Sequence, residues 1–286
     1  MADFKTYSIN VGGKLIEMTR PYVMGILNVT PDSFYCGSRC GADTGLIEER
    51  VARMAAEGAD IIDVGGYSSR PGAAYVPAEE ELNRLRAGIA AIRKIAPGMV
   101  ISVDTFRADV ARRCVEEMGV HIINDISGGD LDPSMMETVA GLKVPYIVMH
   151  MRGDPSTMQS LTSYHDVTAE VIGHLARKVA QLRLLGVCDV IVDPGFGFSK
   201  TLEQNCQLMR EVGELAVLDC PLLVGISRKS MIYKLLGTTP DDALNGTSVL
   251  NTIALLQGAN ILRVHDVAMA VEAVKIVGAV TGMYKF

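Results

Sequence analysis

Tryptophan is absent from this chain of 286 residues, and aromatic residues make up only 5% of it. The core is therefore expected to consist mainly of Val, Ile, Leu and Ala side chains. Basic residues are also fewer than acidic ones, since 27 Lys and Arg stand against 33 Asp and Glu, for a net charge of −6. Nucleic-acid-binding domains more often carry a basic excess. We therefore expect no nucleic-acid partner, and only small phosphate ligands bound by a few cations.

Long apolar runs are missing as well. No run approaches the roughly 18 apolar residues of a membrane-spanning helix, and the first residues lack the cationic and apolar regions of a signal peptide. The six cysteines form no Cys-x-x-Cys pair, which favours free thiols in a reducing compartment. These absences predict a cytoplasmic protein without a membrane partner.

Eight short apolar runs, each followed by a polar residue, are the main feature that is present. The residues at or just after their ends are Asn28, Asp63, Asp104, Asn124, His150, Asp193, Lys229 and Arg263. Buried parallel strands read as continuous apolar runs, and here they alternate with helical patterns, which is typical of repeated βαβ units. The sequence predicts an α/β fold with a single (β/α)8 TIM barrel, whose active site lies at the carboxyl ends of the strands.

A two-stranded β-hairpin is expected before the barrel, over residues 4–11 and 14–18, with its turn at Gly12-Gly13. It would cover the amino-terminal end of the barrel. The predicted organisation is thus a hairpin extension, residues 1–19, and a barrel, residues 20–286. Helices are expected at residues 45–57, 78–95, 107–117, 134–140, 164–185, 201–215, 241–257 and 267–281. Long loops at residues 31–43, 65–77 and 151–163 are candidate binding loops or lids.

Four of the strand-end residues, Asp63, Asp104, Asn124 and Asp193, carry carboxylate or amide groups. Such groups at a barrel mouth can bind the donors and acceptors of a polar heterocycle. Each one alone can instead cap the following helix. Four caps together are a weaker explanation than one shared site.

Cations follow the last two strands. Lys229 can form a Schiff base, donate to a ligand carbonyl or ring nitrogen, or simply lie on the surface. Ser230 is placed to start a short helix that can receive a carboxylate. Arg263, His265 and, after the second strand, Arg70 suit a phosphate site, which recurs in this part of the fold. The alternative for Arg263 is an ion pair with Asp266 or another acid.

Three further positions have a functional and a structural interpretation. Asn28 supplies a neutral oxygen that suits Mg²⁺, or it forms a turn. Phe198 can stack on a planar ring, or pack its own loop. Met149 can line a flat apolar pocket, whereas the neighbouring His150 is expected to be structural.

Taken in order, these segments resemble the dihydropteroate synthase family. The matching segments are residues 24–34, 63–72, 102–105, 124–126, 193–198, 227–230 and 263–266, and the resemblance covers about residues 22–280. It implies that 4-aminobenzoate is joined to (7,8-dihydropterin-6-yl)methyl diphosphate with Mg²⁺, giving 7,8-dihydropteroate and diphosphate in folate biosynthesis.

The resemblance also assigns site residues by motif position. It implies that the pterin is bound by Asp104, Asn124, Asp193, Lys229, Met149, Gly225 and Phe198. It implies that the diphosphate is bound by Asn28, Arg70, Arg263 and His265, with Asn28 on the metal. It implies that 4-aminobenzoate lies near Ser69, Pro71, Phe198 and Ser230. Lys229, Arg263, His265 and Asp104 are the catalytic candidates, and the expected mechanism is dissociative substitution.

Two positions depart from the family pattern. Tyr67 stands where many members have Glu, and Cys36 stands where many have an acid in a closing loop. Three other functions are therefore weighed. They are methyl transfer from a folate to a corrinoid partner, a catalytically weak paralogue that binds pterin or a protein, and a Schiff-base aldolase using Lys229. A homodimer is expected, with residues 241–257 and 267–281 as its apolar face or, alternatively, packed on the barrel.

Overall fold

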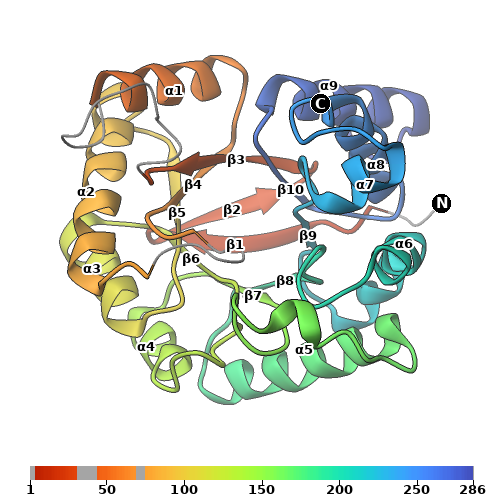
Figure 1. The fold of residues 1–286 in the computed structure, drawn as a ribbon. Helices are drawn as coiled ribbons and strands as arrows, with labels where there is room; N and C mark the ends of the chain where they lie inside the picture. Colours follow the sequence, from red (N-terminus) through yellow and green to blue (C-terminus); the bar gives the residue numbers. More distant parts are fainter. Residues whose placement is uncertain (1–3, 31–43, 69–74, 286) are drawn as a thin grey trace.

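The structure, a computed structural model, describes residues 4–30, 44–68 and 75–285. Eight parallel strands follow one another in the order β8-β7-β6-β5-β4-β3-β10-β9, and a parallel bridge between Val192 and Leu222 brings the two ends of the sheet together. Figure 1 shows the helices surrounding these strands. The strands are β3 (Tyr22–Asn28), β4 (Ile61–Gly65), β5 (Val100–Asp104), β6 (Ile122–Asp125), β7 (Tyr146–Met149), β8 (Val190–Asp193), β9 (Leu223–Val224) and β10 (Ile261–Val264). The predicted barrel is confirmed.

The helices agree with the expected order. They are α1 (Thr44–Ala56), α2 (Ala78–Ile95), α3 (Ala108–Met118), α4 (Met135–Leu142), α5 (Val167–Leu184), α6 (Leu202–Arg210), α7 (Ser230–Leu236), α8 (Leu244–Leu256) and α9 (Val267–Thr281), with 3-10 turns at Met158–Ser160 and Val212–Leu218. Three expected helix boundaries were wrong by three or more residues. One of them is the start of α8, which was expected at residue 241 and lies at Leu244. Helix α5 begins three residues late because the Asp166 carboxylate accepts from the backbone N–H groups of Thr168 and Ala169. The single helix expected at residues 201–215 changes to 3-10 turns after Glu211.

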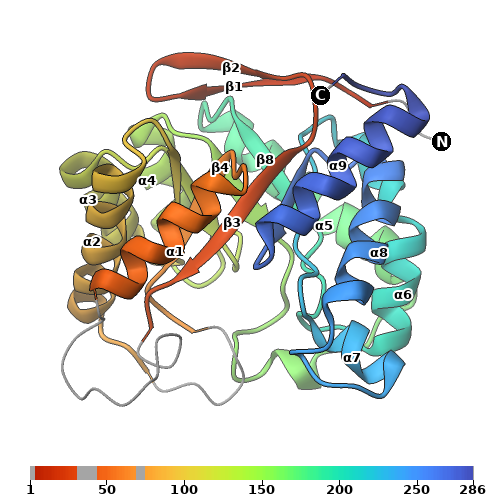
Figure 2. The ribbon, with the colours of Figure 1, turned by 90° about the horizontal axis from the view of Figure 1, so that it is seen from above.

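The expected hairpin consists of β1 (Tyr7–Val11) and β2 (Lys14–Met18), which pair antiparallel. Figure 2 shows it lying across one end of the barrel. Its buried side chains form one apolar cluster with the first residues of the barrel strands. The members of this cluster are Ile9, Val11, Met18, Met24, Ile61, Ile122, Ile147, Ile191, Leu223 and Ile261. The hairpin therefore closes the amino-terminal end, which leaves the carboxyl end for ligands.

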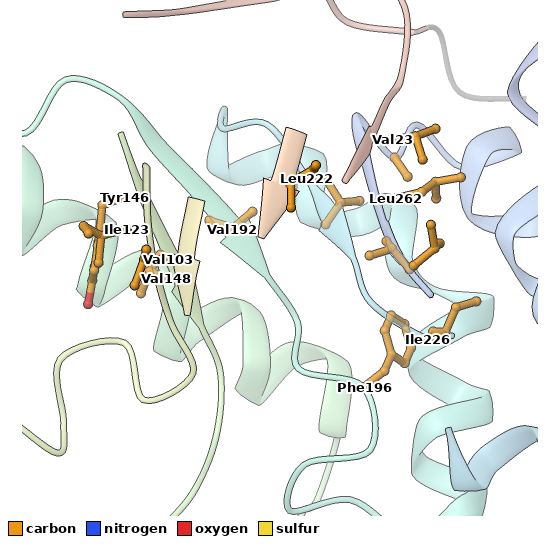
Figure 3. Close-up of a cluster of buried hydrophobic side chains, with 14 of the residues drawn as sticks. Val23, Val103, Ile123, Tyr146, Val148, Val192, Phe196, Leu222, Ile226 and Leu262 are labelled. Carbon is orange, nitrogen blue, oxygen red and sulfur yellow. The ribbon is translucent and has the colours of Figure 1, made fainter. Parts of the chain in front are cut away.

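A second, larger core lies between the strands and the surrounding helices. Val103, Val148 and Val192 contribute to it from three strands, and Tyr146 is the largest fully buried side chain (Figure 3). The Tyr146 hydroxyl donates to Asp125 over 2.7 Å, so its one polar atom is satisfied. Among the helices that the structure describes, none is both long and apolar enough to span a membrane.

Replacing Met18 tests the role of the hairpin as a cover. Met18 is fully buried in the closing cluster, so Met18→Ala should lower the free energy of unfolding by about 2–5 kcal/mol. Leu15→Ala, on the same strand but 69% exposed, should change it by at most about 0.5 kcal/mol. Urea denaturation measures both values. Equal effects of the two substitutions would contradict the packing described.

Candidate active site

Three acidic or amide residues of neighbouring strands meet around one guanidinium. Asp104 ends β5, Asn124 is next to last in β6, and Asp63 lies two residues before the end of β4. Arg263 of β10 donates from Nε to Asp63 Oδ2 and from Nη2 to Asp104 Oδ2, each over 2.7 Å. Asn124 of β6 donates to the same oxygen of Asp63 over 3.0 Å. Side chains of β4, β5, β6 and β10 are thus joined into one network at the barrel mouth.

The alternative that these strand-end residues cap helices is wrong. Helices α2, α3, α4 and α6, which follow β4, β5, β6 and β8, have Pro77, Arg107, Ser134 and Thr201 at their amino-terminal caps. The four side chains are therefore left to bind one another or a ligand.

The sequence left open whether Arg263 pairs with Asp266 or another acid, and the structure shows its partners. Asp266 is paired with Arg228 instead, with the Arg228 Nε 2.8 Å from an Asp266 oxygen. Arg263 does form ion pairs with acids, but these acids are the strand-end carboxylates Asp63 and Asp104. The two contacts use two of its five N–H donors, so the guanidinium can hold the carboxylates and still donate to an anion.

Burial is the strongest influence on the pKa of Asp104. It raises the pKa of this carboxyl to about 7, although the Arg263 charge acts in the opposite direction, and the nearby Asp63 raises it further. The side chain at the end of β5 is thus held between its protonated and ionised forms near neutral pH. Perturbed carboxyls in a cleft are typical of functional sites.

Asp193 and Lys229 form the second half of the site. Burial raises the pKa of Asp193, whose Oδ1 accepts from the Gly195 backbone N–H over 2.7 Å. Burial lowers the pKa of Lys229 to about 8. Its ammonium donates to the Phe196 carbonyl and lies 4.7 Å from the Phe198 ring centre. Lys229 is therefore a partly buried donor, and the surface alternative is wrong.

Gly225 connects the two halves. A Cβ at this position would lie 3.8 Å from Arg263 Cβ and 3.9 Å from Asp193 Oδ2, so Gly225 lies between the two charged residues. Phe198 packs against a small apolar cluster that contains Met149 and Ile126. The site therefore has charged groups on several strands and an apolar wall formed at the end of β7 and after β8.

Asn28 and His265 lie at the same end of the barrel. A Cβ on Gly65 would lie 3.3 Å from Asn28 Oδ1 and 3.8 Å from Asp104 Cβ, which places Asn28 beside the acidic network. The Nδ1 of His265 lies 3.1 Å from Ser227 Oγ. Burial lowers the pKa of His265 to about 4, so its imidazole is neutral at pH 7.

Several expected positions are not part of the described chain. Ser69, Arg70, Pro71 and Cys36 lie outside the described residues. Ser230 is described, and it begins α7 as expected. Tyr67 is described too, and its ring packs edge-on against Phe106 with 5.3 Å between ring centres. The Arg107 guanidinium lies 5.8 Å from the centre of the Tyr67 ring, so the surroundings of Tyr67 combine an aromatic ring with a cation.

Lys200 is a residue of this region that sequence reasoning missed. It is only 4% exposed, and burial lowers its pKa to about 7. The Nζ lies 3.0 Å from His150 Nδ1, which supports the structural interpretation of this histidine. The one available signal was its position two residues after Phe198, because a lysine otherwise reads as a surface residue.

The chain was compared with known proteins and structures. A family model described as pterin binding enzyme matches residues 24–265. The dihydropteroate synthase of Escherichia coli is 44% identical over 271 residues, which cover 93% of this chain and 94% of that protein.

Solved structures are similar over nearly the whole length. A Yersinia pestis dihydropteroate synthase in complex with a sulfonamide drug has a TM-score of 0.88 and 38% identity, covering 96% of this chain and 100% of that one. A Xanthomonas albilineans dihydropteroate synthase with 4-aminobenzoic acid has a TM-score of 0.87 and 36% identity, covering 97% and 99%.

The raised pKa of Asp104 predicts how stability depends on pH. The folded protein keeps a proton on this carboxyl up to about pH 7, whereas an unfolded aspartate loses it near about 3.9. This contribution to stability is full below the unfolded pKa and is lost as pH rises through the folded one. Asp104→Asn should remove it, so that the variant gains stability relative to the unsubstituted protein as pH rises from about 5 to about 8.

Urea denaturation over this pH range measures the effect. Asp109→Asn, at an exposed position on α3, is the matched control and should leave the pH dependence unchanged. Parallel stability profiles for the Asp104 variant and the unsubstituted protein would show that Asp104 titrates at its ordinary pKa.

Proposed function

Because this chain belongs to the dihydropteroate synthase family of folate synthesis, we propose that it joins 4-aminobenzoate to (7,8-dihydropterin-6-yl)methyl diphosphate. The products are 7,8-dihydropteroate and diphosphate. The observation that carries the proposal is the network in which Arg263 binds Asp63 and Asp104, with Asn124 attached to Asp63. It presents acceptors and donors together at the barrel mouth, where enzymes of this fold bind their substrates.

The pterin is assigned to Asp104, Asn124, Asp193 and Lys229. Carboxylates accept from the N–H and amino donors of the pterin, the amide can both donate and accept, and the lysine donates to ring or carbonyl acceptors. Within the described residues, the buried Asp63 Oδ1 has no hydrogen-bond partner. An unsatisfied buried acceptor is costly, and a ligand donor would remove this cost. Met149, Gly225 and Phe198 complete the pocket around the flat ring.

The diphosphate is assigned to Arg263, His265 and Arg70. Arg263 keeps N–H donors beyond those used by its two carboxylates. His265 is neutral at pH 7 before the anion binds, and an adjacent anion would favour its charged form. Donors placed where negative charge develops stabilise the departing group.

Asn28 is the proposed ligand of Mg²⁺. The described residues contain no group of three His, Cys, Asp or Glu side chains that could hold a metal. A single amide oxygen nevertheless fits an ion that keeps several waters and binds mainly through substrate phosphates. When bound, this ion neutralises part of the diphosphate charge, and Asn28 holds it at the end of β3.

We further propose that the C–O bond to diphosphate breaks before the arylamine attacks. The motifs that carry the assigned residues contain no nucleophile pair, and the electron-rich pterin can carry the positive charge of the methylene group. Ser69, Pro71, Phe198 and Ser230 then hold 4-aminobenzoate, with the hydroxyl and backbone N–H groups near Ser230 placed for its carboxylate.

The exposed apolar residues of α8 and α9 support the expected homodimer. Val249, Ile276 and Val280 are 51%, 62% and 80% exposed, and α8 and α9 lie side by side in Figure 1. We propose that this face binds a second copy of the chain.

We also propose that the protein is located in the cytoplasm.

Turnover with and without metal tests the reaction directly. Incubation of the protein with both substrates and Mg²⁺ should release dihydropteroate and diphosphate, and EDTA should stop the release. The readout is chromatography of both products. Product formation that continues in EDTA would exclude the metal requirement, and no product under either condition would exclude the reaction.

Positional isotope exchange tests the order of bond breaking. With ¹⁸O in the oxygen that bridges the pterin methylene and diphosphate, the label should scramble within the diphosphate even without 4-aminobenzoate. Fragmentation of the recovered substrate in tandem mass spectrometry reports it, because scrambling moves the label without changing the total mass. A label that stays in place although bound diphosphate re-forms the substrate would exclude dissociative substitution.

Two aspartates at opposite ends of β8 provide a test variant and its control for the pterin assignment. Asp193→Asn, at the carboxyl end of β8, should raise the dissociation constant of the pterin about tenfold to a hundredfold, because it removes a charged acceptor. Asp189→Asn, just before β8, should leave this constant unchanged. Titration calorimetry with a dihydropterin measures both. An unchanged constant for the Asp193 variant would contradict its assignment to the pterin.

A further inference from the structure

We propose that Lys200 is a positioning residue, which fixes the loop of residues 195–198 and thereby sets the Phe198 wall of the substrate site. The inference rests on the proposed function for its activity readout. Lys200 precedes Thr201, the amino-terminal cap of α6, and it lies within the protein, since only 4% of its surface is exposed. The assigned substrate contacts do not include it.

The hydrogen bonds of Lys200 go to uncharged groups. Its Nζ donates to the carbonyl oxygens of Gly195, at 2.9 Å, and Phe198, at 3.0 Å, and it lies 3.0 Å from His150 Nδ1. Among the contacts of the described residues, none pairs it with a carboxylate. A buried ammonium without a direct ion pair is costly, although the charge of the nearby Asp193 favours its protonated form. Its three hydrogen bonds offset this cost, so the contacts to the loop and the burial of the lysine depend on each other.

The two carbonyl contacts span the whole loop. Gly195 and Phe198 are its first and last residues, and a backbone hydrogen bond from Phe198 N–H to Gly195 O joins them as well. Gly195 has φ +69°, and a Cβ there would collide with the His150 carbonyl oxygen. The loop therefore packs closely against His150, which follows β7. Lys200 contacts both ends of the loop and also His150.

His150 can keep the contact in either protonation state of the lysine, as acceptor from the ammonium or as donor to the neutral amine. Burial lowers the pKa of His150 to about 2, so the ring is neutral. An ammonium on Lys200 has three donors for its three acceptors. A neutral amine donates to the two carbonyls and accepts from a protonated Nδ1. The contacts to the loop persist in both cases.

Phe198 is the residue by which Lys200 affects the substrate site. Lys200 donates to the Phe198 carbonyl oxygen. The Lys229 ammonium lies over the Phe198 ring and donates to the Phe196 carbonyl. The ring packs in turn against the cluster that contains Met149. Loss of the Lys200 contacts should release the backbone of Phe198, which would displace an aromatic wall assigned to both the pterin and 4-aminobenzoate.

Substitution with chemical rescue tests this role. Lys200→Ala removes three carbons and the amine, which together equal propylamine, and Lys200 borders a pocket of about 270 Å³ through which an amine can enter. We expect the KM for 4-aminobenzoate to rise about tenfold, with a smaller change in kcat, and added propylamine to reverse most of the rise. Propane-1-ol, which has one donor, should reverse less of it.

Two further variants keep the test decisive. Lys234→Ala changes an exposed lysine that borders the same pocket, so it should alter neither KM nor the response to propylamine. Lys200→Met keeps the apolar stem without the donors, and it should reproduce the KM effect if the alanine variant fails to fold. A Lys200 variant with normal KM overturns the proposal. A loss that propylamine does not reverse also overturns it, because general damage to the structure then explains the loss.

A readout without turnover separates this inference from the proposed function. The chain has six phenylalanines and no tryptophan, so incorporation of 4-fluorophenylalanine gives six ¹⁹F signals, of which Phe198→Leu identifies one. In Lys200→Ala this signal should shift or broaden, and propylamine should restore it. An unchanged signal overturns the inference. If the unsubstituted protein turns over neither substrate, the proposed function fails while the ¹⁹F result still decides the role of Lys200.

Discussion

The guanidinium of Arg263, held between Asp63 and Asp104, is the interaction on which the barrel mouth depends. It places a cation among strand-end carboxylates that would otherwise repel one another, and it connects β10 to β4 and β5 across the intervening β3. Asp63 is fully buried. Removing the cation would leave it uncompensated, a change that typically costs about 3–5 kcal/mol. The same contacts leave donors for an anion, so one side chain links the stability of the barrel to the proposed binding of diphosphate.

Much of the fold could be predicted because buried parallel strands and amphipathic helices leave strong periodic patterns. Helices α2 and α9 begin and end at the expected residues, and Pro77, directly before α2, suits the start of a helix. The break after Arg210 was missed, since the apolar pattern continues through the 3-10 turns up to Leu218. Local sequence does not distinguish these two helical geometries when both bury the same face.

The candidate site could be predicted as a set of residues but not as a set of contacts. That the strand-end polar residues share one end of the barrel follows from parallel strand direction alone. The pairing of Arg263 with Asp63, 200 positions apart, depends on how the barrel closes. The burial of Lys200 could not be predicted either, because it arises from tertiary packing. Tyr67 packs against Phe106 and lies 5.8 Å from the Arg107 guanidinium, so its side chain is explained by local packing.

A crystal structure with a bound dihydropterin would test the central claim most directly, namely that the strand-end residues form one pterin site. We expect the ring to lie at the carboxyl end of the barrel, with hydrogen bonds to Asp104, Asn124, Asp193 and Lys229 and its face near Phe198. Arg263 should keep its contact with Asp63 in this complex. A pterin bound elsewhere on the protein, or one that contacts none of these four side chains, would contradict the assignment.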